Sequence, residues 1–360
     1  MRPKKQRFYQ FVIVSAAFSL LVFPTVVWFS AYSKFDCSVL KDIQQFKDYY
    51  QDNFPFRKQM IRIYYGITSK LCFQSTSHIP GTKSNWFFLE RTYRGFLGKN
   101  EFSSDKKKVV VHKLEAIDRF LKKRNIKLIV MITPDKIQIY PEFLPWIMRR
   151  KQAKINSCED LVKYINQHSD ILICYPKKEL IQHKTAGLLY YPNDSHWTMK
   201  GAYIAFYHIA GFMDGKISWP HPQKLPWIEK EVSFGDLKLV FPYKVHFPAG
   251  IAHTTTYDVQ HTFDLEKRDR RFITPEAPSK LKIMVFHDSF FISMEPYFHH
   301  FFCETHQVAR TIDYGLIEKE RPNIVFFQVV ERNADSLLTL TDPPQEPMDA
   351  NELRQPVLKD

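Results

Sequence analysis

The sequence predicts an α/β fold with a parallel β-sheet flanked by helices. Residues 106–124 carry apolar side chains at the period of a helix, and they lead into 126–132, an apolar run of strand length. A helix joined by a short link to a buried strand is the building block of a parallel sheet. Residues 158–174 give a second unit of this kind, and the apolar runs at 281–286 and 322–330 contain a third and a fourth strand.

The beginning of the chain predicts a membrane anchor. Four basic residues lie among the first seven, and 11–29 then contains no charged residue. At ~1.5 Å per residue, a run of this length just crosses a ~30 Å hydrocarbon core. The basic flank favours a cytoplasmic N-terminus, with everything after Tyr32 on the far side of the membrane. We favour this uncleaved anchor over a cleaved signal peptide, because the run exceeds the usual h-region of ~7–15 residues.

These patterns divide the chain into four regions. Residues 1–33 form the basic tip and anchor, 34–105 form a helical segment that ends in a turn and a short strand, and 341–360 form an extended, proline-rich tail. The α/β domain occupies 106–340. Within it, 219–276 is rich in proline, aromatic residues and threonine without a helical period, which indicates a β-rich insertion or lid near the active face.

The charge of the chain limits its partners. The formal net charge is +13, yet no pattern of an RRM, a helix-turn-helix or a zinc finger accompanies it. We therefore expect no nucleic acid partner. A basic surface instead suits anionic lipid head groups or an acidic polysaccharide.

The five cysteines contain no C-x-x-C pair and no zinc-ligand spacing, so we expect no metal site and no cofactor. An exported domain permits disulfides. Cys158 opens a helix and Cys174 closes the following strand, an arrangement that can bring the two together. The alternative is that each thiol is an ordinary small buried side chain.

Asp194 and His196 are two residues apart in a segment that reads as extended backbone. Side chains in an extended segment alternate between faces, so these two point the same way while Ser195 and Trp197 point the other way. A carboxylate that accepts the Nδ1 proton fixes the imidazole tautomer and leaves Nε2 free to take a proton from a nucleophile. Taken alone, the pair also fits a surface loop or half of a metal site.

Ser289 follows the predicted strand 281–286 by three residues, directly after Asp288. Parallel sheets place their chemistry at the carboxyl ends of the strands, which makes this serine a candidate nucleophile. Asp288 and Ser289 are also good helix N-caps. The two interpretations are compatible, because the amides of a following helix can stabilise an oxyanion.

Six short motifs occur in order along the chain, and together they resemble one known family. They are NFPFR at 53–57, WFF at 86–88, TPDK at 133–136 with YPE at 140–142, DSHWT at 194–198, DSF at 288–290 and VER at 330–332. This order is similar to that of the AlgX/AlgJ-type family of polysaccharide (alginate) O-acetyltransferases with an SGNH hydrolase-like domain. The family usually has a glycine where this sequence has His287.

The resemblance implies a function and a set of roles. Ser289 would be the nucleophile, His196 the general base and acid, and Asp194 the residue that orients the histidine. The acetyl groups would come from a membrane-bound O-acyltransferase in the inner membrane, and an exported polysaccharide would accept them. The domain at 106–340 would then be SGNH hydrolase-like and periplasmic or otherwise extracytoplasmic.

Other residues are candidates for supporting roles. A tetrahedral intermediate needs hydrogen-bond donors, and we consider the amides of Ser289 and Phe290 and the side chain of Arg332. An ion pair of Arg332 with Glu331 or Asp335 is the alternative for that residue. We assign possible substrate contacts to the residues that follow strands at the same face or lie beside His196, namely Arg332, Lys136, Tyr140 and Trp197.

Two other functions fit the same residues. An acetylesterase uses the same triad and differs only in that water resolves the acyl-enzyme. A scaffolding subunit of a polysaccharide assembly complex would retain the triad without using it. The sequence leaves all three functions open.

Overall fold

The computed structural model describes residues 78–81, 86–99, 102–225, 228–232, 236–237, 247–251, 260–264, 269–309 and 312–344. All of them belong to the second of two compact units, which begins at Thr76. The predicted anchor at 11–29 and the helical segment at 35–70 lie outside the described residues. Within those residues, no helix has both the length and the apolar character needed to cross a bilayer.

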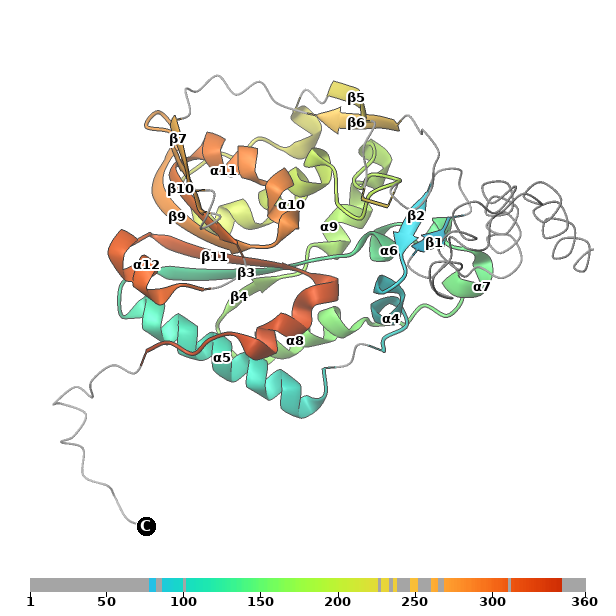
Figure 1. Cartoon of the computed structure of the whole chain (residues 1–360), viewed down its shortest axis with the longest axis horizontal. Helices are drawn as coiled ribbons and strands as arrows, with labels where there is room; N and C mark the ends of the chain where they lie inside the picture. The colour runs from blue at the N-terminus through green and yellow to red at the C-terminus, as the bar shows by residue number, and fades with distance from the viewer. Residues whose placement is uncertain are drawn as a thin grey trace, which may run out of the picture. The chain divides into compact units, whose positions relative to one another are not determined.

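A seven-stranded sheet forms the centre of this unit (Figure 1). Its spatial order is β4 (Leu172–Cys174), β3 (Lys127–Thr133), β11 (Ile324–Val330), β9 (Ser279–His287), β10 (Phe302–Ala309), β8 (Asp269–Ile273) and β7 (Gln260–Asp264). The first five strands run parallel, whereas β8 and β7 pair antiparallel at one edge. The sheet is therefore mixed and mostly parallel rather than purely parallel, because the two antiparallel strands come from the 219–276 region.

Helices cover both faces of the sheet (Figure 1). One face of the sheet carries α5 (Ser104–Lys122), α8 (Ser157–His168), α12 (Tyr314–Glu320) and the 3-10 segment η8 (Glu331–Thr339). The opposite face carries α6 (Lys136–Ile139), α9 (Lys177–Gln182), α10 (Met199–Met213), η7 (Ser289–Ser293) and α11 (Glu295–Phe301). Smaller elements are β1 (His78–Pro80), β2 (Phe87–Leu89), α4 (Thr92–Phe96), η3 (Pro141–Phe143), α7 (Trp146–Arg149), η4 (Lys184–Ala186) and η5 (Pro222–Lys224).

The sheet separates two hydrophobic cores. Successive side chains of a strand point to opposite faces, so Ile129 and Met131 of β3 enter one core while Leu128 and Val130 enter the other. All four are buried. The unbroken apolar runs in the sequence are explained by this burial on both faces.

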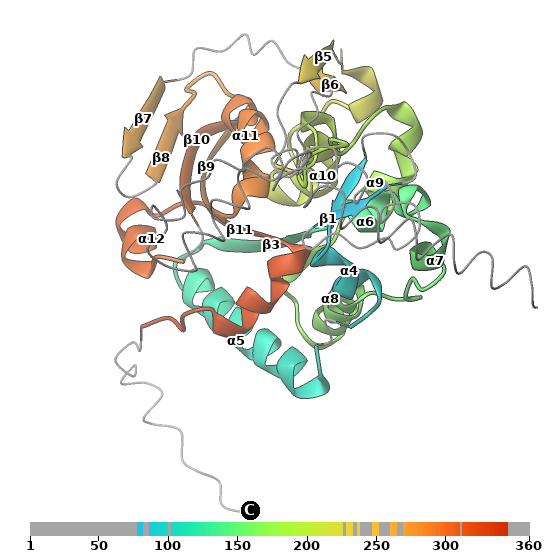
Figure 2. The same ribbon diagram turned by 45° about the vertical axis from the view of Figure 1, so that its right-hand side comes forward.

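The insertion at 219–276 contributes strands in two places. A hairpin-like pair, β5 (Ile228–Val232) with β6 (Phe247–Ile251), forms a separate two-stranded sheet. β7 and β8 extend the central sheet beside β10, as Figure 2 shows at its upper left. Trp219, which we had grouped with a lid over the site, instead packs its ring against Phe206 and Phe301 in the core.

Cys158 and Cys174 are both free thiols, so the disulfide considered above is not formed. Cys158 lies in the core on the α8 face, whereas Cys174 packs against the core on the other face. The alternation of side chains along β4 turns the Cys174 thiol away from α8, and the sheet stands between the two.

Candidate active site

Three parallel strands deliver polar side chains to the same edge of the sheet. β3 leads to Asp135, β9 leads to Asp288 and Ser289, and β11 leads to Glu331 and Arg332. Because β3, β11 and β9 are neighbours and run parallel, their carboxyl ends lie together. This is the edge at which open α/β sheets place their ligands.

The loop that carries Asp194 and His196 is held as a turn in front of α10. A single bridge joins Tyr190 to Trp197. Thr198 then caps α10 by accepting a hydrogen bond from the amide of Gly201 at 3.2 Å. Position 201 admits only glycine, because an added Cβ would stand 2.3 Å from the carbonyl oxygen of Leu189. The loop therefore begins and ends at fixed points.

Asp194, His196 and Ser289 form a continuous hydrogen-bonded chain. His196 Nδ1 lies 2.7 Å from Asp194 Oδ1, and His196 Nε2 lies 2.8 Å from Ser289 Oγ. The histidine ring is partly open, with 26% of its side chain exposed, and Ser289 is exposed. The two side chains meet as expected, and the serine from the distant strand reaches the free ring nitrogen. The backbone at 192–196 is a turn with bends and is not extended as predicted, so Ser195 also lies beside the site, where its hydroxyl contacts Asp236 and Arg332.

Asp194 is held in its ionised form by its neighbours. Its Oδ1 also accepts the amide of His196 at 2.8 Å, and its Oδ2 accepts the amide of Asp236 at 3.0 Å. Burial alone raises the pKa of this carboxyl, but the hydrogen bonds and charge of His196 outweigh it and lower the pKa to about 2. A carboxylate that stays charged can stabilise an imidazolium ion when the histidine takes up a proton.

Asp236 is a part of the site that the sequence analysis missed. It belongs to the 219–276 insertion, and its carboxylate accepts both the amide and the hydroxyl of Ser195. The next residue, Leu237, donates its amide to the carbonyl of Asn193 at 3.1 Å. This short part of the insertion is therefore fixed against the loop that carries Asp194 and His196. No local pattern around Asp236 could have indicated this long-range contact.

Asp288 positions the turn that bears the serine. Its carboxylate accepts the amide of Phe290 at 2.9 Å and the amide of Val330 at 2.7 Å, which ties the end of β9 to the end of β11. The helix-capping interpretation of Asp288 thus applies together with the nucleophile interpretation of Ser289. His287 fits without a glycine-type backbone, since the only non-glycine residues with positive φ in the described chain are Asn125 and Arg321.

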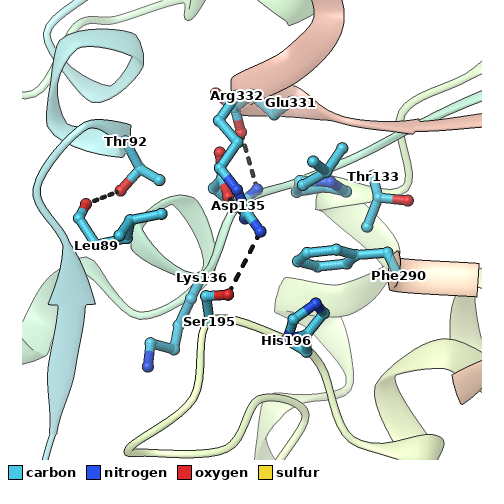
Figure 3. Close-up of polar contacts among 12 residues, drawn as sticks. Leu89, Thr92, Thr133, Asp135, Lys136, Ser195, His196, Phe290, Glu331 and Arg332 are labelled. Atoms are coloured by element: carbon cyan, nitrogen blue, oxygen red, sulfur yellow. Dashed lines mark hydrogen bonds and ion pairs between the residues drawn. The ribbon is translucent and has the colours of Figure 1, made fainter. Parts of the chain in front are cut away.

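Arg332 pairs with Asp135 and not with Glu331 or Asp335, the partners weighed above. Its Nη2 also lies 3.4 Å from Ser195 Oγ, and its guanidinium packs near the ring of Phe290. Figure 3 shows the side chain extending from the end of β11 toward Ser195. Only 6% of the Arg332 side chain is exposed. Burial lowers the pKa of Arg332, but the charge of Asp135 outweighs this effect and raises it.

Lys136 and Tyr140 lie beneath the site, which differs from the substrate-facing positions that we expected. Lys136 is 3% exposed, and its ammonium group donates to the carbonyl oxygens of Tyr191, Pro192 and Asp194 at 3.0, 3.0 and 2.6 Å. Burial lowers the pKa of Lys136 to about 7. Tyr140 is also buried, and its hydroxyl accepts the amide of Leu189 at 3.0 Å. Both residues hold the loop that carries Asp194 and His196.

Trp197 is buried as well, although we had grouped it with the substrate contacts. Its indole Nε1 donates to the carbonyl oxygen of Phe290 at 2.8 Å. The residue after His196 is thus bonded to the residue after Ser289. This bond fixes the distance between the two segments that carry the base and the nucleophile.

The candidate oxyanion donors are reduced to one by the geometry. The amide of Phe290 is used by Asp288, and the guanidinium of Arg332 is directed at Asp135 and Ser195. The amide of Ser289 has no acceptor within the described part of the chain. Of the three groups considered from the sequence, this amide is the one available to an acyl oxygen.

Asp194, His196 and Asp236 also offer donor atoms that lie within 4.8 Å of one another, which is the arrangement of a possible cation site. Every carboxylate oxygen in this cluster accepts a hydrogen bond from an amide, a hydroxyl or the imidazole. The close approach of the three side chains is thus explained by hydrogen bonding within the loop.

Residues 81–273 match the family described as "SGNH hydrolase-like domain, acetyltransferase AlgX", which covers more than half of the 360 residues. The matched segment contains Asp194 and His196 and ends before Ser289. No curated protein sequence matches this chain.

Several solved structures are similar. Bacillus cereus PatB1 with a sulfonyl adduct has a TM-score of 0.53 at 14% identity, over 73% of this chain and 98% of that chain. A DHHW family protein from Eubacterium siraeum has a TM-score of 0.50 at 15% identity, over 64% and 89%. The O-acetyltransferase domain of Pseudomonas putida AlgJ has a TM-score of 0.44 at 12% identity, over 72% and 92%. At these identities, the first two indicate a shared fold.

Proposed function

The chain belongs to the AlgX family of SGNH hydrolase-like acetyltransferases, and from this premise we propose that it is an O-acetyltransferase acting on hydroxyl groups of an exported cell-surface polysaccharide. The observation that supports the proposal most strongly is the hydrogen-bonded chain from Asp194 through His196 to Ser289. A serine hydroxyl becomes a useful nucleophile when a base is within hydrogen-bond reach and a third group orients that base.

In the first half of the reaction, Ser289 Oγ forms a bond to the carbonyl carbon of an acetyl donor while His196 Nε2 takes the hydroxyl proton. The oxygen of the tetrahedral intermediate receives a hydrogen bond from the amide of Ser289. The bond to the leaving group then breaks, and His196 returns the proton to the leaving oxygen. Asp194 stabilises the imidazolium ion throughout, because its carboxylate remains charged.

In the second half, a sugar hydroxyl attacks the acetyl carbon of acetyl-Ser289. His196 takes the proton of that hydroxyl and later returns it to Ser289 Oγ. The products are the acetylated sugar and the free serine. An acetylesterase would follow the same steps with water as the second nucleophile, so the identity of the acceptor separates the two activities.

The location and partners are part of the same proposal. Residues 1–33 would anchor the chain in the inner membrane by a single span, and 106–340 would work in the periplasm beside a membrane-bound O-acyltransferase that delivers acetyl groups. Tethering an enzyme beside its donor raises their effective concentration. A reporter fused after Tyr32 should lie outside the cytoplasm, and a mature chain that starts near Lys34 would contradict an uncleaved anchor.

The experiment follows acetyl groups from a donor to a sugar. The full chain in detergent receives an aryl acetate together with neutral or acidic oligosaccharides, and mass spectrometry measures acetylated sugar against free acetate. We expect acetylated sugar from the native protein and a drop of about 10²-fold or more in Ser289→Ala and His196→Ala. Ser104→Ala, which changes an exposed serine at the start of α5 on the other face of the sheet, is the matched control and should keep full activity.

Three outcomes would change the assignment. Free acetate without acetylated sugar, from every oligosaccharide tried, would favour the esterase. Absence of turnover with any donor would favour a scaffolding subunit. Full activity of Ser289→Ala would reject the triad itself.

A further inference from the structure

The segment 146–155, which contains α7 and the loop that leads to α8, carries exposed apolar side chains. Seven large hydrophobic side chains are exposed in the described part of the chain, and three of them lie here: Trp146, Ile147 and Ile155. Trp146 is 61% exposed, the highest value of the seven. Single apolar residues are ordinary at a surface, but a group of them marks an interaction site. None of the three belongs to the candidate active site.

Packing fixes α7 with two of these side chains on its outer side. Leu144, just before the helix, is buried, and Met148 within it packs against the same core. The hydroxyl of Tyr93 donates to the carbonyl oxygen of Met148 at 3.2 Å, which ties the turn to α4. Because Met148 takes the inner side of this single turn, Trp146 and Ile147 are left on the outer side. Their exposure therefore follows from the packing of the turn.

The same segment is strongly basic. Residues 143–158 contain no Asp or Glu. Within 146–155, four exposed cations form no ion pair with the described residues: Arg149, Arg150, Lys151 and Lys154. The guanidinium of Arg150 lies 5.3 Å from the ring centroid of Trp146, so a cation and an apolar ring share the surface. The surface is thus apolar and positively charged at once.

This combination fits the interface of a bilayer. Tryptophan is enriched at the level of the lipid head groups, and exposed aliphatic side chains gain by leaving water for the acyl boundary. Each lysine or arginine near an anionic leaflet raises the binding equilibrium by about fivefold. An acidic polysaccharide would also attract the cations, but it offers no apolar phase to Ile147 and Ile155. The apolar side chains therefore favour a lipid surface.

We propose that segment 146–155 docks on the surface of a bilayer that contains anionic lipids. Trp146 and Ile147 would enter the head-group region while the four cations contact anionic head groups. α7 lies at the outer edge of the unit beyond α6, at the end of the sheet to which β3 leads (Figure 1 and Figure 2). The candidate active site is at that end as well, so docking would hold it near the membrane.

This docking is separate from acetyl transfer and from the predicted anchor. It uses none of Asp194, His196 and Ser289, so Ser289→Ala should dock as the native chain does. An anchor at 11–29 would enter neutral and anionic bilayers alike, whereas docking of 146–155 needs the negative charge of the lipid. A comparison of the two lipids on one chain therefore distinguishes them.

Hydrogen exchange of the full chain tests the contact. The chain is incorporated in nanodiscs of phosphatidylcholine alone or of an equal mixture with phosphatidylglycerol, and mass spectrometry follows the peptides that cover 144–156. We expect slower exchange of these peptides in the anionic discs than in the neutral discs, and no such difference for peptides of α5. The difference should shrink at high salt, which screens the attraction.

Two variants of the segment test its two properties. Arg149→Gln/Arg150→Gln/Lys151→Gln should lower the docking equilibrium by roughly a hundredfold, since each cation contributes about fivefold. Trp146→Ser should also reduce the protection, because it removes the apolar ring. These side chains are exposed, so neither variant should lower the melting temperature of the chain in detergent.

The matched control is Lys108→Gln/Lys163→Gln/Lys216→Gln, which removes the same charge from exposed lysines of α5, of α8 and of the loop after α10. It should retain the protection of 144–156 in anionic discs. Equal exchange in neutral and anionic discs, or equal losses in the two triple variants, would overturn the proposal. Protection by a uronic acid oligosaccharide in neutral discs, with none by anionic lipid, would also overturn it and would assign the surface to a polysaccharide.

Discussion

Asp194 holds His196 through two atoms, the main-chain amide and the imidazole Nδ1, and it is held in turn by the amide of Asp236. At the scale of single residues, this arrangement fixes the tautomer of the histidine. The ring nitrogen that faces Ser289 is left to act as the base.

The state of Asp194 leads to a prediction on acid stability. Burial raises its pKa, but hydrogen bonds and the charge of His196 outweigh this and lower it to about 2, below the ~3.9 of an unfolded aspartate. The charged carboxylate therefore stabilises the folded state by roughly 2 kcal/mol at pH values above ~3.9. This contribution is lost as the pH falls through the pKa of Asp194 in the folded protein. Asp194→Asn removes it, so the melting temperature of the variant should fall less steeply between pH ~5 and ~2.

The control for this measurement is Asp170→Asn, which changes an exposed carboxylate between α8 and β4. Its melting curve should follow the native pH dependence. If the native protein and Asp194→Asn lose stability in parallel on acidification, Asp194 is not held in its charged form.

Some residues of the candidate site could be predicted from the sequence, and others could not. The spacing of Asp194 and His196 is local, so the pair could be predicted from the sequence, but the extended backbone from which we predicted it is wrong. Residues 192–196 form a turn and bends, and the two side chains meet because the Asp194 carboxylate accepts both the amide and the Nδ1 proton of His196. Asp236 and the Asp135–Arg332 pair depend on loops meeting across the fold. Lys136, Tyr140 and Trp197 follow strands or lie beside His196, and for that reason we predict substrate contacts for them. In the structure they are buried and support the segments that carry the site residues.

At the scale of elements, α6 supports the loop that carries Asp194 and His196 through one side chain. Lys136 opens α6 directly after β3, and its ammonium group serves three carbonyl oxygens of the loop 191–194. The aromatic rings of Trp86 and Phe88, from the region of β2, lie near the same ammonium group. A buried lysine at a strand end thus replaces water as the partner of an irregular loop.

Lys136→Met tests this support. The substitution keeps the length of the side chain but leaves three buried carbonyl oxygens without their donor, so it should lower the free energy of unfolding by about 2–4 kcal/mol. Because the loop carries Asp194 and His196, kcat should fall by at least about tenfold with a smaller change in KM. Chemical denaturation and steady-state kinetics measure the two effects.

Lys178→Met, on the exposed surface of α9, is the matched control and should leave stability and rate unchanged. A fall in stability of Lys136→Met with kcat retained would mean that the lysine supports the fold without positioning the triad.

The elements that the sequence predicts well are those with one clear period. Residues 157–168 form α8 as expected, and the apolar runs become β3, β9 and β11. β10 was missed because buried polar residues interrupt its pattern, among them Thr305, His306 and Gln307. A strand inside a sheet that carries such side chains has no apolar run by which to recognise it.

At the scale of the whole unit, the order of the strands determines which side chains meet at the candidate active site. β3, β11 and β9 are distant in sequence but adjacent in the sheet, and their ends bring Asp135, Arg332 and Ser289 to one edge. The insertion adds the antiparallel strands β8 and β7 at one edge of the sheet. It also contains Asp236, which contacts the loop that carries Asp194 and His196. Helix and strand periods predict the parallel units, but they carry no information on strand order or on where an insertion folds back.

The central claim is that Ser289 carries the acetyl group. The measurement that tests it most directly is intact-protein and peptide mass spectrometry after the full chain reacts with an aryl acetate and is quenched in acid. We predict one acetyl group per chain, located on the peptide that contains Ser289, with much slower labelling in His196→Ala and none in Ser289→Ala. Acetyl transfer that proceeds with the label on another residue, or with no label while Ser289→Ala stays active, would contradict the assignment.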